Sequence, residues 1–120
     1  MRCSAYPIVR SSVTWLEQAK NDRLRVMAQF TVRVELHRAM AEDYLRLHSA
    51  MEQSGFSRTI KGADGNTYLL PTADYERNGE NLTGEQVHND AWRAAASVSA
   101  RFSILIIEAS AITWSGLTQV

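Results

Sequence analysis

The order in which hydrophobic periodicity changes along the chain constrains its fold more than any other feature of the sequence. Apolar and polar residues alternate from Phe30 to Leu36, which is the pattern of a strand buried on one face. Later segments switch between the period of a helix and the period of a strand. The periodic segments, in chain order, are residues 30–36, 39–53, 56–61, 67–70, 83–98 and 102–107. They predict strand, helix, strand, strand, helix and strand.

This order is that of the ferredoxin-like βαββαβ sandwich, an α+β fold in which an antiparallel sheet carries two helices on one face. Gly55 is placed to end the first helix, and the turn residues 62–66 join the two middle strands as a hairpin. Thr83 and Gln86 have the spacing of a capping box at the start of the second helix. Residues 76–81 are predicted to form an exposed loop.

The last predicted strand is apolar on both faces. Phe102, Ile104 and Ile106 lie on one face, and Leu105 and Ile107 lie on the other. Two helices cover one face of such a sheet, so the second set of side chains needs another cover. The alternatives are a partner subunit, the N-terminal segment, or the C-terminal segment 111–117 acting as a short fifth strand.

The N-terminal segment, residues 1–26, has a weaker pattern than the rest of the chain. We interpret it as an extension, either dispensable or packed as a helix on a compact domain of residues 27–120. The single cysteine, Cys3, has no partner for an internal disulfide, which favours a reducing cytoplasmic environment. No apolar run typical of a signal peptide follows Arg2 and Arg10.

The charge balance restricts the partners that we expect. Thirteen basic residues match thirteen acidic ones, so a global positive field that would attract nucleic acid is absent, and any RNA contact must be local. We expect no DNA partner and no membrane partner. The sequence also contains no phosphate-binding loop, zinc quartet or HExxH motif, so we predict no cofactor and no metal site.

Two histidines are candidates for acid–base chemistry on RNA. An imidazole can accept the proton of a ribose 2′-hydroxyl, and an imidazolium can protonate the departing 5′-oxygen. His37 follows the first strand and shares a face with Arg33 and Glu35, in a row spaced about 7 Å apart. His48 lies on the first helix. The alternative for each is a structural or solvent-exposed side chain.

Four basic residues are candidates for phosphate binding. Arg33 lies on the first strand, Arg58 and Lys61 lie on the second, and Arg46 lies on the first helix. Arg46 could instead pair with Glu42, one helical turn away. The others could be ordinary surface residues, because the chain has no excess of positive charge.

One segment resembles a known family. Residues 44–57, YLRLHSAMEQSGFS, are similar to the helix-to-strand segment of GhoS antitoxins of type V toxin–antitoxin systems. The likeness includes Leu45-Arg46-Leu47, the spacing of Ser49 and Met51, and the Phe-Ser pair that opens the second strand. The fold of that family is similar to the small CRISPR-associated ferredoxin-like nucleases.

The resemblance implies an endoribonuclease that silences a membrane-damaging toxin by cutting the toxin's messenger RNA. The histidine chemistry described above implies cleavage that is independent of metal ions. Arg46 carries over from the family's pattern, and His48 stands where that pattern has a second arginine. The hypothesis we favour is a dimeric protein in which Arg46, Arg33 and Arg58 hold phosphates, and His48 or His37 is the acid or base.

The competing hypothesis is a non-enzymatic homodimer or interaction module. In this interpretation Leu105 and Ile107 are buried in the interface between two subunits. A charged residue in place of Leu105 would then dissociate the dimer.

Overall fold

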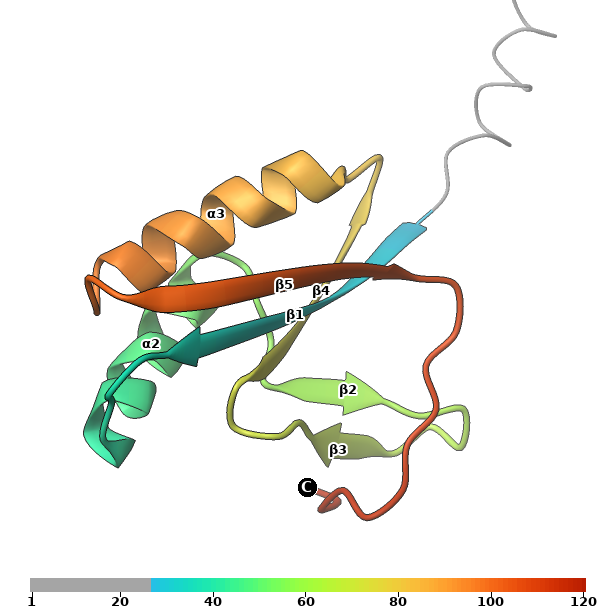
Figure 1. Cartoon of the computed structure of the whole chain (residues 1–120). Helices are drawn as coiled ribbons and strands as arrows, with labels where there is room; N and C mark the ends of the chain where they lie inside the picture. The colour runs from blue at the N-terminus through green and yellow to red at the C-terminus, as the bar shows by residue number, and fades with distance from the viewer. Residues whose placement is uncertain (1–26) are drawn as a thin grey trace, which may run out of the picture.

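The computed structural model describes residues 27–120, and the predicted N-terminal extension lies outside the described residues. The described part has an α+β architecture, as predicted, with two helices, a three-stranded antiparallel sheet and a separate two-stranded sheet (Figure 1). The elements are β1 (Met27–Leu36), α2 (Ala41–Gln53), β2 (Thr59–Lys61), β3 (Thr67–Leu69), β4 (Asp74–Glu80), α3 (Gly84–Ala96) and β5 (Phe102–Ala109).

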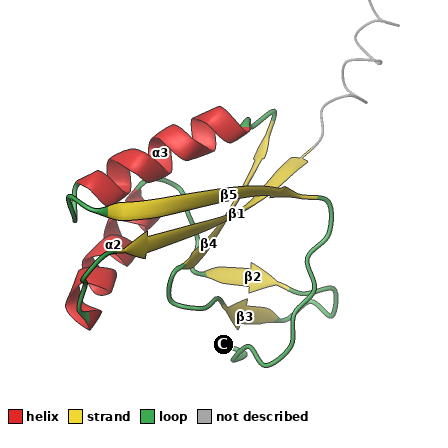
Figure 2. Cartoon of the chain, in the orientation of Figure 1, coloured by secondary structure: helices red, strands yellow, loops and turns green. Residues whose placement is uncertain are grey.

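Strand β1 is the centre of the larger sheet. The strand order is β4-β1-β5, and both neighbours run antiparallel to β1 (Figure 2). In this register Val32 lies opposite Tyr75 on one side and opposite Ile106 on the other. The first strand of the chain therefore lies between β4 and β5 and pairs with both.

The face of β1 that the sequence predicts to be buried is buried. Phe30, Val32 and Val34 are at most 1% exposed. They belong to one hydrophobic cluster that also contains the apolar stripes of both helices, so α2 and α3 cover the same face of the sheet. The helix residues of this cluster that are buried are Leu47, Met51, Val87, Ala91, Ala94 and Ala95. Met40 is exposed and precedes α2.

The ends of both helices follow the sequence signals. Thr83 Oγ1 accepts a hydrogen bond from the Gln86 N–H, and the Gln86 side chain accepts one from the Thr83 N–H, which confirms the predicted capping box. Gly55 follows α2 with a φ of +95°, a left-handed conformation that residues with a Cβ rarely adopt. Residues next to each boundary therefore determine where α3 begins and where α2 ends.

Strands β2 and β3 form the predicted hairpin across the turn 62–66. β3 ends at Leu69, just before Pro71, which has no N–H to donate to a ladder. Ahead of β2, Ser57 pairs with Glu76 of β4 through reciprocal backbone hydrogen bonds of 2.8 and 2.9 Å. The start of the hairpin therefore lies against the outer edge of β4.

The prediction of an exposed loop over residues 76–81 is wrong. Most of this segment belongs to β4, which pairs with β1 over seven residues. Its composition is polar, and Asn and Gly disfavour strands, so local propensity conceals the pairing. Tertiary contacts compensate, because Arg77 donates to Asp90 of α3 and its guanidinium lies 5.2 Å from the centre of the Phe56 ring.

The C-terminal segment does not cover β5. Residues 111–117 form no strand, and beyond them the Leu69 N–H donates to the Thr118 carbonyl and the Val120 N–H donates to the Thr67 carbonyl. The tail thus extends the β2-β3 hairpin. Leu105 and Ile107 remain 55% and 46% exposed, so this alternative for their cover is excluded.

Candidate functional site

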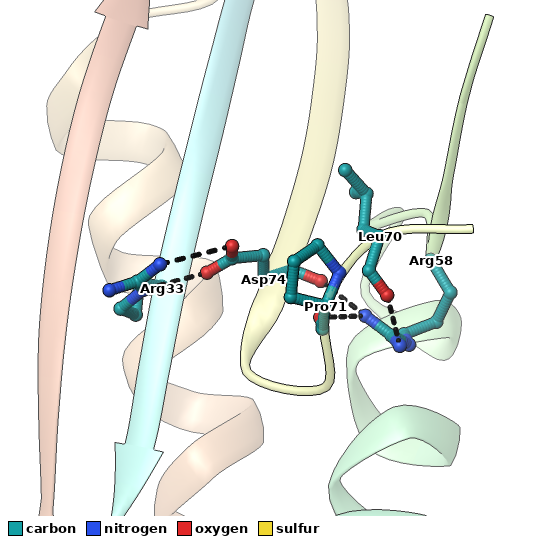
Figure 3. Close-up of polar contacts among 5 residues, drawn as sticks. All are labelled: Arg33, Arg58, Leu70, Pro71 and Asp74. Atoms are coloured by element: carbon teal, nitrogen blue, oxygen red, sulfur yellow. Dashed lines mark hydrogen bonds and ion pairs between the residues drawn. The ribbon is translucent and has the colours of Figure 1, made fainter. Parts of the chain in front are cut away.

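Arg33 is held by a carboxylate of the neighbouring strand. Its Nε donates to Asp74 Oδ1 at 2.8 Å and its Nη2 donates to Oδ2 at 3.2 Å (Figure 3). This hydrogen bond and the Asp74 charge raise the pKa of Arg33. Asp74 is 9% exposed, so a phosphate would have to displace a largely desolvated, two-pronged partner before it could bind Arg33.

Arg58 holds the connection between β3 and β4. Its guanidinium donates to the carbonyl oxygens of Leu70 and Pro71 at 2.7 Å and of Asp74 at 2.5 Å (Figure 3). Burial lowers the pKa of Arg58, although the fixed charge of an arginine persists at neutral pH. The donors that a phosphate would use are already occupied by the backbone.

His48 is joined to a buried tyrosine. Its Nδ1 lies 2.6 Å from the hydroxyl of Tyr75, and the two rings meet edge to face. Burial raises the pKa of Tyr75, so the hydroxyl keeps its proton, and we assign it as the donor to Nδ1. Burial and the Arg58 charge lower the pKa of His48. The ring is therefore neutral at pH 7, with its proton on Nε2.

Arg46 lies on the exposed side of α2. It pairs with Asp43, three residues earlier, and not with Glu42, whose spacing of four residues also allows a pair. The Arg46 side chain is 60% exposed. Residues two positions apart in a helix are separated by about 200° around its axis, so Arg46 and His48 project from opposite sides of α2. The structure does not bring them to one phosphate.

His37 and Lys61 lie apart from this group. The His37 ring bonds the Ser103 hydroxyl through Nε2 at 2.8 Å, and Arg33, Glu35 and His37 are all exposed on one face, as the alternation of β1 predicts. Lys61 is exposed at the end of β2, and its side chain forms no hydrogen bond or ion pair with another residue of the described range.

Five residues form one continuous chain of contacts through β4. Arg33 contacts Asp74, the Asp74 carbonyl accepts from Arg58, Arg58 lies 5.4 Å above the Tyr75 ring, and Tyr75 bonds His48. The sequence alone does not connect them, because residues 76–81, most of which belong to β4, have the composition of a loop. Had residues 74–80 been read as a strand beside β1, Asp74 would have been placed opposite Arg33.

A buried carboxylate on β4 was also missed. Glu76 is 6% exposed and accepts a hydrogen bond from the Gln29 side chain. Burial raises the pKa of Glu76, and the Gln29 amide opposes that rise. Like Asp74, this residue is tied to β1 by a side-chain contact across the sheet.

Comparisons with known proteins give no relative: no protein-family model, curated protein or solved structure matches this chain. Within residues 27–120 no group of three or more His, Cys, Asp or Glu side chains is arranged to hold a metal ion. Neither α2 nor α3 has both the length and the apolar character that crossing a membrane requires.

Proposed function

We propose that the domain is ferredoxin-like and that its strand order extends beyond the three paired strands. The bridge between Ser57 and Glu76 supports this, because it adds the β2 segment to the outer side of β4. The resulting order is β2-β4-β1-β5, with β3 as the outer arm of a hairpin that twists away. Two crossover helices on one face of such a sheet give the split βαβ arrangement.

We infer further that the chain acts on RNA in the manner of GhoS antitoxins, as an endoribonuclease on a toxin messenger RNA in the cytoplasm. One observation carries this proposal. Arg46, the residue that matches the family's pattern, is exposed and paired with a single neighbouring carboxylate. Exposed ion pairs of this kind contribute about 0–1 kcal/mol, so Asp43 can be exchanged for a phosphate at little cost.

The roles that we propose for the two histidines differ from those expected from the sequence, in which either His48 or His37 was the acid or base. His48 has its Nδ1 occupied by Tyr75 and presents an N–H at Nε2, so it is a donor rather than a base. His37 has an exposed ring and a hydroxyl partner that water can replace. We therefore assign phosphate binding to Arg46 and propose His37 as a separate candidate for proton transfer, with Arg33 and Arg58 stabilising the fold.

The test is cleavage of a labelled, mixed-sequence single-stranded RNA pool by the full chain in the presence of EDTA. We expect cutting to persist in EDTA and to fall at least tenfold in Arg46→Ala and in His37→Ala. Arg93→Ala is the matched control, because Arg93 forms the same kind of i,i+3 pair with Asp90 and is 71% exposed. RNA left intact by folded protein would contradict the proposal.

Salt provides a second test of phosphate contacts. RNA binding that depends on Arg46 should weaken steeply as salt rises, because counterions are released from the RNA when a phosphate is neutralised. The Arg46→Ala variant should show a shallower salt dependence than Arg93→Ala. Equal slopes would argue against a phosphate contact at Arg46.

A second candidate function is a non-enzymatic homodimer, and a specific observation favours it. Leu105 and Ile107 lie on the sheet face opposite the helices and are about half exposed at 55% and 46%. Branched apolar side chains side by side on a strand are typical of a surface that a partner covers. The dimer is compatible with RNA cleavage and does not require it.

A further inference from the structure

The outer edge of β5 has no partner strand among residues 27–120. β1 pairs with the inner edge along eight residues, from Phe102 to Ala109, and the sheet ends there. Soluble proteins usually protect such edges with proline, lysine, a bulge or a short strand. β5 contains no proline and no lysine, and five of its first six residues are apolar. An edge of this kind is a template for pairing with another strand.

The register identifies the backbone groups that this edge presents. The His37 N–H donates to the Arg101 carbonyl at 3.1 Å, so this opposed pair is of the hydrogen-bonded type. Pair types alternate along an antiparallel ladder, so Ser103, Leu105 and Ile107 also direct their N–H and C=O groups toward β1. The groups of the intervening residues, Phe102, Ile104, Ile106 and Glu108, point outward.

Apolar side chains flank this edge on both faces of the sheet. Leu105 and Ile107 are exposed on the open face. On the helix face Trp92 of α3 is 51% exposed, and its ring lies edge to face with Phe102 at a centroid distance of 6.0 Å. A strand that paired here would bury apolar surface above and below the sheet.

We propose that the occupant of this edge is a second copy of the chain, through antiparallel pairing of β5 with β5 about a two-fold axis at Leu105. This inference deepens the homodimer proposed above and rests on it. In this register Ile104 of each copy lies opposite Ile106 of the other, and the outward N–H and C=O groups of these two residues face each other. The strand is therefore complementary to itself in its backbone groups and in apolarity.

The pairing closes as a dimer rather than growing into a fibre. A two-fold contact uses the same surface of both subunits and so uses up both β5 edges. The opposite side of the sheet is different, because Ser57 pairs with β4 there. Two three-stranded sheets would join into one, with the helices of both copies on the same side.

Cysteine cross-linking in a Cys3→Ser background tests both the pairing and its register in the full chain. The two Leu105 residues would form a non-hydrogen-bonded pair with Cα atoms about 4.5 Å apart, which a disulfide can bridge. We expect Leu105→Cys to form a covalent dimer under mild oxidation. Ser103→Cys alone should not cross-link, since residue 103 of one subunit would lie more than about 10 Å from residue 103 of the other. Ser103→Cys mixed with Ile107→Cys should cross-link.

A backbone variant supplies an independent readout. The Glu108 N–H points away from β1, so Glu108→Pro removes an outward donor and spares the ladder with β1. We expect sedimentation to show a dimer for the parent chain and a folded monomer for Glu108→Pro.

A parent chain that stays monomeric at every concentration would overturn the inference, as would cross-linking that does not depend on position. A monomer in which residues 1–26 protect the β5 edge from amide exchange would overturn it in favour of an intramolecular cover. The RNA assay keeps the proposals apart: a dimer that leaves RNA intact contradicts only the nuclease, and a monomer that cuts RNA contradicts only the pairing.

Discussion

The two sides of β1 differ in how their side chains are used. On the β4 side, Arg33, Asp74 and Arg58 hold one another or the backbone, and His48 bonds Tyr75. On the β5 side, Leu105 and Ile107 are about half exposed, and the outer edge of the strand is unpaired within residues 27–120. On the β4 side the polar side chains that could bind phosphate or transfer protons form contacts within the protein. On the β5 side apolar side chains that could form a core are exposed.

This contrast shows that residue type does not determine availability. An arginine on a strand, such as Arg33, is a candidate phosphate ligand, but the buried carboxylate opposite it accepts hydrogen bonds from the donors that a phosphate would use. A leucine on a strand suggests a core, but it remains at the surface when both helices lie on the other face. The predictions below test whether the β4 side stabilises the fold and whether the β5 side recognises a partner.

The largest effect is expected at Arg58. In Arg58→Ala the carbonyl oxygens of Leu70 and Asp74 lose the Arg58 donor, and the Pro71 carbonyl keeps only the Asp74 N–H. Leaving such groups unpaired should lower the free energy of unfolding by about 3 kcal/mol, measured by urea denaturation. Lys61→Ala, on the same hairpin, should change it by less than about 0.5 kcal/mol. Equal effects would show that Arg58 does not hold the connection to β4.

A smaller effect is expected at Tyr75. Tyr75→Phe keeps the buried ring and removes the hydroxyl, so His48 Nδ1 loses its hydrogen-bond partner. The free energy of unfolding should fall by about 1 kcal/mol. The ring nitrogen resonances of His48 should report the change, because its tautomer is no longer fixed by a donor at Nδ1. An unchanged tautomer would contradict the assignment of Tyr75 as the donor.

Much of this architecture could be predicted from the sequence, because local signals set it. The alternation of β1, the capping box at Thr83, the stop at Gly55 and the turn of the hairpin each depend on neighbouring residues. β4 could not be predicted in this way. Its residues are polar, and the pairing that orders them comes from β1, more than forty positions away in the chain.

The site was harder to predict than the fold, for a related reason. Arg33, Arg58 and His48 are candidates by their chemical type, and their partners Asp74 and Tyr75 lie on β4, which the sequence does not predict. Local sequence identifies groups capable of chemistry. Whether those groups are occupied depends on which strand lies beside them, and that is a long-range property.

Glu76 allows a test by pH. Burial raises the pKa of this carboxyl above its ordinary value of 4.5, so the native state binds its proton more tightly than the unfolded state. The free energy of unfolding therefore falls as pH rises through the folded pKa of Glu76. Glu76→Gln, which retains an acceptor for Gln29, should be more stable than the parent at pH 7, and the difference should shrink below pH 4.5. A difference independent of pH would contradict the burial argument.

The smallest effect on the stability of the fold is expected on the β5 side, where the effect on association should be decisive. Leu105→Glu replaces a side chain that is 55% exposed, so the unfolding free energy of the monomer should change by less than about 0.5 kcal/mol. Leu45→Glu is the matched control, because Leu45 lies on α2 and is 67% exposed. Sedimentation should show a monomer for Leu105→Glu and a dimer for Leu45→Glu. If both variants kept the parent's mass, the apolar surface of β5 would not be an interface. If both lost it, general surface hydrophobicity rather than a paired edge would hold the copies together.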